Sequence, residues 1–176
     1  MVKCPNSRRL PSGSVAERAA SAYIAEPMTG RRIDIAIVGG GLSGALLALA
    51  LDRLHPGRRI VLIEAGERFG GNHVWSWFRR DVSRLDDWLL APLVARRWQG
   101  YDVRFPGHSR QLASAYSSMT GESLDAGLRQ VLPANALWTG CAAASLAPDR
   151  VTLADGREIA AGGVIDARGA AGLPHM

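Results

Sequence analysis

The feature that most constrains the fold of this chain is a glycine-rich segment, Gly39-Gly40-Gly41-Leu42-Ser43-Gly44, with the spacing G-x-G-x-x-G. The β-branched apolar run before it, residues 33–38, is typical of a strand buried on both faces. The run after it, residues 42–54, predicts a helix that ends at His55-Pro56-Gly57. Residues 59–65 predict a second buried strand. Strand, glycine loop, helix and strand in this order predict a βαβ unit of the Rossmann type.

Each glycine of the loop has a physical task in such a unit. Gly39 permits the tight turn, Gly41 lets the backbone approach a diphosphate, and Gly44 lets the helix pack closely on the sheet. The diphosphate would lie against the free N–H groups and the positive end of the helix. We therefore expect a dinucleotide site at Gly39, Gly40, Gly41, Leu42, Ser43 and Gly44.

An acidic residue stands where this type of site needs one. Glu64 lies 20 residues after Gly44, at the end of the second predicted strand, and Ala65 follows it. A carboxylate there can accept both hydroxyl groups of an adenosine ribose, and it would repel a 2′-phosphate, which argues against NADP at this site. We include Glu64 and Ala65 in the predicted site. The alternative is a glycine-rich turn with a capping acid nearby.

The loop alone does not distinguish FAD from NAD, because the two share it. Two later segments favour FAD. Gly70-Gly71, soon after Glu64, resembles the glutathione-reductase type of FAD-binding protein, and residues 164–169 resemble its second strand-to-glycine element near the flavin. This adds Gly71, Asp166 and Gly169 to the predicted cofactor-binding residues. For Asp166 and its neighbour Arg168, a local ion pair at a strand end is the alternative.

The remainder of the chain predicts more strands and helices in a less regular order. Residues 101–105 and 136–141 predict strands, and residues 123–132 predict a helix closed by Pro133. Residues 86–97 predict a helix interrupted by Pro92. Asp155-Gly156, between short strands predicted at residues 150–153 and 157–159, predicts a β-hairpin, and residues 163–167 predict a further strand. The expected fold is therefore α/β: an incomplete Rossmann-like FAD-binding fold of the glutathione-reductase type, with an N-terminal βαβ unit, additional strands and a hairpin.

Charge and composition exclude several other classes of function. The net charge is +5, but residues 1–32 hold six basic and two acidic side chains, so the rest of the chain contributes only +1. We therefore expect a solvated basic tail and no nucleic-acid partner. No apolar run approaches the ~20 residues of a membrane-spanning helix. The two cysteines and scattered histidines do not form a metal-binding pattern, and no serine has a histidine at a suggestive spacing for nucleophilic catalysis.

Three blocks of sequence resemble bacterial lycopene β-cyclases, in that family's order. They are residues 70–78 (GGNHVWSWF), residues 94–106 (VARRWQGYDVRFP) and residues 164–169 (VIDARG). The chain departs from the family where Val74, Trp77, Phe78 and Arg96 stand in place of an expected Thr, Phe, His and His. Phe78 cannot shuttle a proton, so no acid–base role transfers to that position.

The resemblance implies a function, and we state it as an expectation. The family cyclises the linear ψ-ends of lycopene to β-ionone rings, an isomerisation that nevertheless needs reduced FAD, with NAD(P)H serving to reduce the flavin. A proton adds to the terminal double bond, the developing cation is attacked intramolecularly, and a ring proton is lost. Such chemistry requires a dry pocket that stabilises positive charge. The two distant cysteines fit a reducing compartment, so we expect a cytoplasmic protein. The lipid-soluble substrate that the resemblance implies makes a peripheral position on the inner face of the membrane an alternative.

Several assignments stay open at the level of sequence. We expect a flexible N-terminal extension at residues 1–30 and an FAD-binding domain at residues 31–176 that stops before the substrate domain, as in a fragment or truncated gene product inactive alone. No catalytic residue is assigned. His73 is either a proton donor near the flavin or a structural residue, and the five tryptophans either line a polyene channel or pack in the core. Another flavoprotein, such as a monooxygenase or an isoprenoid reductase, or an inert FAD-binding fragment, is the alternative function.

Overall fold

The computed structural model describes residues 33–169, which form a mixed α/β fold around a six-stranded sheet. The strand order is β8-β2-β1-β11-β10-β9. In this sheet the strands are β1 (Ile33–Val38), β2 (Ile60–Ile63), β8 (Leu137–Trp138), β9 (Ala143–Ala147), β10 (Arg150–Leu153) and β11 (Glu158–Asp166). The predicted extension at residues 1–30 lies outside the described residues.

The predicted βαβ unit is confirmed. Strand β1 lies between β2 and β11 and pairs in parallel with both. Helix α1 (Leu42–Leu54) has the predicted bounds, and strand β2 is slightly shorter than predicted. Strand β1 is buried on both faces because its side chains alternate between two hydrophobic clusters, with Ile37 in one and Ala36 in the other. The first cluster also holds core residues of α1, and the second is closed by the strands that follow β8.

The predicted hairpin is also confirmed, but its second strand is longer than expected. Strands β10 and β11 pair antiparallel around the turn at Asp155-Gly156. The sequence predicted two short strands at 157–159 and 163–167, separated by small residues. The structure instead has one continuous strand, because its first half pairs with β10 and its second half with β1. Hydrogen bonding to two different neighbours keeps the backbone extended through Gly162-Gly163.

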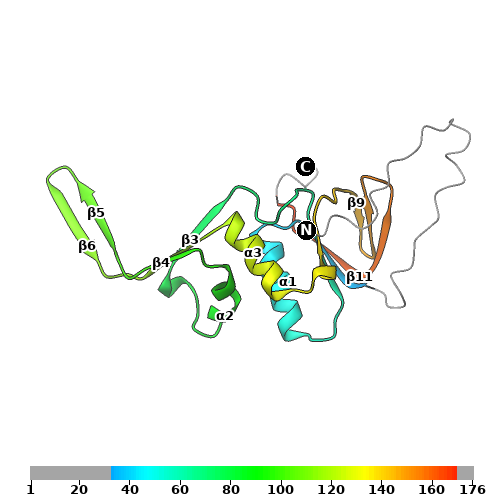
Figure 1. The fold of residues 1–176 in the computed structure, drawn as a ribbon, viewed down its shortest axis with the longest axis horizontal. Coiled ribbons are helices and arrows are strands. Elements are labelled where there is room, and N and C mark those ends of the chain that lie inside the picture. Colours follow the sequence, from blue (N-terminus) through cyan, green and yellow to red (C-terminus); the bar gives the residue numbers. More distant parts are fainter. Residues whose placement is uncertain (1–32, 170–176) are drawn as a thin grey trace, which may run out of the picture.

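Residues 74–120 leave the main sheet and return to it. A three-stranded sheet in the order β3-β7-β4 and a separate hairpin β5–β6 extend away from the six-stranded sheet, with α2 beside them (Figure 1). The strands here are β3 (Val74–Phe78), β4 (Arg96–Trp98), β5 (Tyr101–Phe105), β6 (His108–Leu112) and β7 (Tyr116–Thr120). Sequence reasoning predicted β5 but did not identify β3, β6 or β7.

The helix predicted at residues 86–97 is wrong in its second half. Helix α2 covers only Asp87–Leu90, a 3-10 turn follows at Ala91–Leu93, and β4 begins at Arg96. Pro92 lies at the start of that 3-10 turn, where a proline lacking an N–H is tolerated. Strand β4 forms because β7, distant in sequence, offers it a hydrogen-bonding edge. Pairing with β7 therefore overrides the local preference of this segment for a helix.

Helix α3 (Gly121–Val131) confirms the predicted helix at 123–132 and packs against α1 and the 3-10 turn. Its N-terminus has a capping box, in which Thr120 Oγ1 accepts from Ser123 N and Ser123 Oγ accepts from Thr120 N. Leu124 and Leu128 of this helix are fully buried in the cluster that includes α1. Among residues 33–169, no helix is long and apolar enough to cross a lipid bilayer.

Candidate functional site

The carboxyl ends of β1, β2 and β11 meet at one edge of the sheet, and each leads into a segment predicted to bind the cofactor. Gly39 N donates to Ile63 O at 2.8 Å, which joins the glycine loop to the end of β2. Ala167 N donates to Val38 O at 2.7 Å, which joins the segment after β11 to the end of β1. The predicted residues of the three segments thus converge, at the edge where open α/β sheets bind ligands.

Glu64 holds the glycine loop in place. Its Oε2 accepts from Gly40 N at 2.7 Å, and its Oε1 accepts from Gly66 N at 2.7 Å. The carboxylate is therefore the capping acid that sequence reasoning considered as the alternative to a ribose ligand. The two roles are compatible, because each carboxylate oxygen has a second lone pair with which it can accept a ribose hydroxyl.

Three glycines of the loop are required by the protein itself. Gly39 has φ +110°, and a Cβ there would lie 2.5 Å from the backbone of Ala167. A Cβ on Gly40 would overlap the ring of Phe69, and one on Gly44 would overlap Gly39 O. The last contact confirms the close helix packing expected of Gly44.

Gly41 is different. Its backbone has φ −72° and ψ −171°, which any residue adopts. A Cβ added there would have none of the described atoms within 4 Å. Neither local conformation nor packing within residues 33–169 therefore explains a glycine at this position. A ligand that approaches the backbone does explain it, so the residues present fit a bound diphosphate.

The start of α1 suits an anion. Gly41 is the N-cap and has no side chain with which to cap the helix, and the first turn carries no acidic residue. The first intrahelical bond runs from Ala45 N to Gly41 O at 3.0 Å. The N–H groups of the first turn, at Leu42 and Ser43, precede that bond and have no intrahelical acceptor, which leaves them available to a phosphate. Leu42 packs against the core, and Ser43 is exposed.

The turn at Gly70-Gly71 contacts both the glycine loop and the start of α3. Gly70 N donates to Gly40 O at 2.8 Å. Gly70 and Gly71 both have positive φ, +78° and +54°. A Cβ on Gly121 would overlap Gly71 O, so the turn lies directly against the start of α3.

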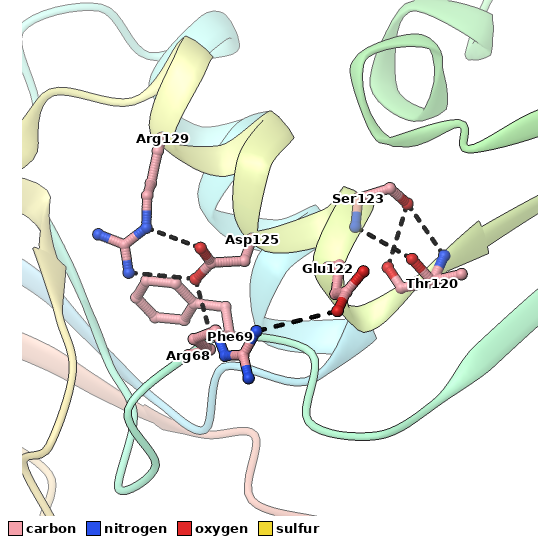
Figure 2. A network of polar contacts seen from close by, with 7 residues as sticks. All are labelled: Arg68, Phe69, Thr120, Glu122, Ser123, Asp125 and Arg129. Carbon is pink, nitrogen blue, oxygen red and sulfur yellow. Dashed lines mark hydrogen bonds and ion pairs between the residues drawn. The ribbon is translucent and has the colours of Figure 1, made fainter. Parts of the chain in front are cut away.

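A polar network on α3 holds Phe69, the residue that precedes this turn. Asp125 accepts from Phe69 N at 3.0 Å and forms a two-point ion pair with Arg129, at 2.8 and 3.1 Å (Figure 2). Phe69 is fully buried beneath the loop. The hydrogen bond with Asp125 raises the pKa of Arg129 above its ordinary value. Sequence reasoning missed Asp125, because the signal is only an Asp–Arg pair at i,i+4 spacing, which is common on solvated helices.

Asp166 and Arg168 form the local ion pair considered as the alternative for these residues. Arg168 Nη2 lies 2.7 Å from Asp166 Oδ2, and Nε lies 2.9 Å from Oδ1. These hydrogen bonds lower the pKa of Asp166 and raise that of Arg168. Gly169, with φ +76°, is exposed beside them at the same edge, as Ala65 is beside Glu64.

The tryptophans divide into two groups. Trp75 and Trp77 pack against the first cluster, Trp138 is buried in the second, and Trp88 lies under the guanidinium of Arg53 at 4.3 Å. Trp98 alone among the five is an exposed large side chain, with 43% of its surface accessible. His73 is exposed and its ring contacts that of Trp75 at 5.4 Å.

An enclosed cavity among the described residues lies away from this edge. Its volume is about 120 Å³, and Arg58, Arg59, Ile60 and Trp138 contribute to its lining. Arg59 precedes β2 and Ile60 begins it, so this cavity is at the amino edge of the sheet, opposite the predicted site. The predicted nucleotide site consists instead of backbone groups at an open edge of the sheet.

Comparison with known proteins identifies the family. The model of the lycopene cyclase protein family matches residues 34–176. The chain belongs to the lycopene cyclase family. A lycopene beta-cyclase from Pseudescherichia vulneris is 44% identical over 136 residues, which are 77% of this chain and 35% of that protein. A lycopene beta-cyclase from Pantoea ananas is 38% identical over the same shares of both chains. The chain thus spans about a third of the length of these curated relatives.

Solved structures with the same fold are more distant in sequence. 2-Methyl-3-hydroxypyridine-5-carboxylic acid oxygenase aligns with a TM-score of 0.55 at 18% identity, over 77% of this chain and 39% of that one. The peptidyl tryptophan dihydroxylase QhpG aligns with a TM-score of 0.55 at 21% identity, over 83% and 34%. At such identities the likeness concerns the fold, which these enzymes share with this member of the lycopene cyclase family.

Proposed function

We propose that the carboxyl edge of the sheet binds FAD, in a fold of the glutathione-reductase type. The observation that carries this proposal is Gly41, a glycine that the described residues do not require and that a bound diphosphate would. The uncapped start of α1, the carboxylate of Glu64 and the nearby Gly70-Gly71 turn support it.

We further propose that the whole protein is a lycopene β-cyclase, like the curated relatives of whose length this chain spans about a third. It would convert the ψ-ends of lycopene to β-ionone rings, a net isomerisation. Family membership and 44% identity to a lycopene beta-cyclase support this over a monooxygenase, since the oxygenases of like fold are at most 21% identical among those compared above. The chain alone should bind the cofactor without turnover. The proposed location is the cytoplasm. A peripheral position on the inner face of the membrane would give the protein access to a lipid-soluble substrate.

The residues of this chain would act by binding and orienting the cofactor. The N–H groups at the start of α1 would hold the diphosphate, and Glu64 would accept the ribose hydroxyls of the adenosine half. The segment at Asp166–Gly169 would lie toward the flavin half. When bound and reduced by NAD(P)H, FAD supplies a negatively charged ring system that stabilises positive charge on the substrate.

Two measurements test the proposal. The purified chain is incubated with FAD and passed through a desalting column, and the visible absorbance of retained flavin is recorded; FAD should be retained, and NADP should not compete with it. In a protein completed with the remaining two thirds of a relative, lycopene should be converted to a cyclised product under reducing conditions. A chain that retains no flavin would refute the cofactor assignment, and flavin retention with oxygenated products would refute the cyclase.

A further inference from the structure

We propose that one face of the three-stranded sheet β3-β7-β4 is a wall of the polyene-binding site. This inference rests on the proposed function and deepens it. The wall is formed by an aromatic strip, which we define as Phe78, Trp98, Tyr101 and Tyr116. It would hold the chain of the hydrocarbon by contact between π surfaces.

The strip is on the open face of its sheet. Successive side chains of a strand point to opposite faces, so Trp75 and Trp77 share one face, and Val74, Ser76 and Phe78 share the other. Trp75 and Trp77 pack against the hydrophobic core. The face with Phe78 therefore points away from the core, and Val74 upon it is 68% exposed.

The strip is continuous across strands. Tyr116 pairs with Phe78 on one side and with Trp98 on the other, so all three lie on the same face. The ring centroids of Phe78 and Tyr116 are 5.4 Å apart, and those of Trp98 and Tyr116 are 5.5 Å apart. Tyr101 extends the strip, with its ring 5.6 Å from that of Phe78. The rings of this connected row, three half-buried and that of Trp98 exposed, form a surface suited to an elongated apolar ligand.

Two hydroxyl groups on this face are hydrogen-bonded to each other. Ser118 is buried beside the strip, and its Oγ lies 2.6 Å from Ser76 Oγ, so one of the two hydroxyls donates to the other. This hydrogen bond persists when a hydrocarbon covers the face, which lowers the cost of removing the two serines from water. Arg96 shares the face but lies on the edge strand β4, where its long side chain can keep its guanidinium in water.

The face begins where the cofactor site ends. Gly70 N donates to Gly40 O of the glycine loop, and β3 starts four residues later at Val74. From Val74 to Phe78 the strand runs about 13 Å, leading away from the nucleotide edge (Figure 1). A hollow of about 360 Å³, whose lining includes Phe78, Arg80 and Arg84, lies at the far end. Arginines there would oppose a carbocation, so we assign the reacting end of the polyene to the Val74 end and its unreacted chain to the strip.

The test compares two tryptophans of one chain. Lycopene in non-ionic detergent micelles is titrated into the FAD-loaded chain, and binding is followed by induced circular dichroism in the visible band of the polyene. We expect Trp98→Ala to weaken binding about fivefold to tenfold, the loss for one aromatic contact. Tyr116→Leu, which keeps volume but removes the ring, should act in the same direction. Trp88→Ala is the matched control and should leave binding unchanged; thermal melting of each variant checks its folding.

The outcomes separate this inference from the cofactor assignment. Loss of lycopene binding in Trp98→Ala with retention in Trp88→Ala supports the wall. Equal affinity in all variants overturns it, as does a chain that binds FAD but no lycopene; the cofactor assignment survives both. The wild-type chain could also bind phospholipid vesicles that contain no polyene as tightly as it binds lycopene, and lose that binding in the same variants. This result would also overturn the inference and identify the strip as a lipid-binding surface. Failure to bind either FAD or lycopene overturns both proposals.

Discussion

Replacement of Gly41 should weaken cofactor binding while leaving folding stability almost unchanged. The site of its missing side chain has none of the described atoms within 4 Å, and its φ is −72°. Gly41→Ala should therefore fold, with a loss of about 0.5–1 kcal/mol from the weaker N-cap preference of alanine. Gly41→Val should fold as well, since its added methyl groups enter the same open space.

The same substitutions should damage flavin binding. A diphosphate at the start of α1 would occupy the space that the new methyl groups fill. Displacing it from one or two N–H donors removes charge-assisted hydrogen bonds of about 1.5–3 kcal/mol each. We therefore expect FAD affinity to fall at least about tenfold in Gly41→Ala, and further in Gly41→Val. Titration of flavin fluorescence measures the affinity, and thermal melting measures stability.

Two other glycines provide controls. Gly163 in β11 also has open space at its side-chain position, so Gly163→Ala should change neither stability nor affinity beyond a few tenths of a kcal/mol. Gly44→Ala should instead destabilise the fold by about 1–3 kcal/mol, because its Cβ overlaps Gly39 O. If Gly41→Val bound FAD as tightly as the wild type, the explanation for this glycine would be refuted, and with it the observation on which the cofactor assignment rests.

Three further perturbations test the supports of the site. Glu64→Ala leaves the buried Gly40 N–H without its acceptor, while the exposed Gly66 N–H can bind water, so the free energy of unfolding measured in urea should fall by about 1–3 kcal/mol. An unchanged midpoint would show that the carboxylate does not hold the loop. Asp125→Ala should lower the free energy of unfolding by about 2–3 kcal/mol. Asp125→Asn should lower it less, because its amide oxygen can still accept from Phe69 N, although Arg129 loses its anionic partner. Equal destabilisation by the two substitutions would contradict the role of the backbone hydrogen bond. Arg168 lowers the pKa of Asp166, so the ion pair stabilises the fold above about pH 4 and that contribution is lost as pH falls through the lowered pKa. Since the pair is partly exposed, Asp166→Asn should lower the free energy of unfolding by less than about 1 kcal/mol at pH 7, and should not change it at a pH below the lowered pKa of Asp166. A destabilisation that did not depend on pH would contradict a stabilising ion pair between Asp166 and Arg168.

The nucleotide half of the fold was predictable because its signals are local. Apolar runs, a glycine string and a strand-end acid each specify a backbone conformation within a few residues. Helix α1 accordingly has the predicted bounds, and Glu64 lies against the loop as its position implied. The sequence left open whether this acid caps the loop or binds a ribose. The structure shows that it accepts from Gly40 N, because β1 and β2 lie side by side.

The segment between Gly71 and Gly121 was less predictable because its strands pair across long separations. Strand β3 pairs with β7 some 40 residues later, for example Ser76 with Ser118, and β4 exists because β7 lies beside it. Local propensity at residues 94–97 favours a helix, and the pairing overrides it. The sequence likewise could not divide the tryptophans, since burial of Trp75 and exposure of Trp98 depend on which face of that sheet meets the core.

By itself, the sequence determined a βαβ unit with a glycine loop, the acid at the end of its second strand, and the resemblance that the family comparison confirmed. The structure brought the segment at Asp166–Gly169 to the edge of the sheet that the resemblance implied. Tertiary structure alone decided that Asp125 accepts from Phe69 N beneath the loop, and that an aromatic face is left open. The physical reason is the range of the interactions. Turn geometry and strand burial are encoded by adjacent residues, whereas sheet register and the face that is covered depend on the whole chain.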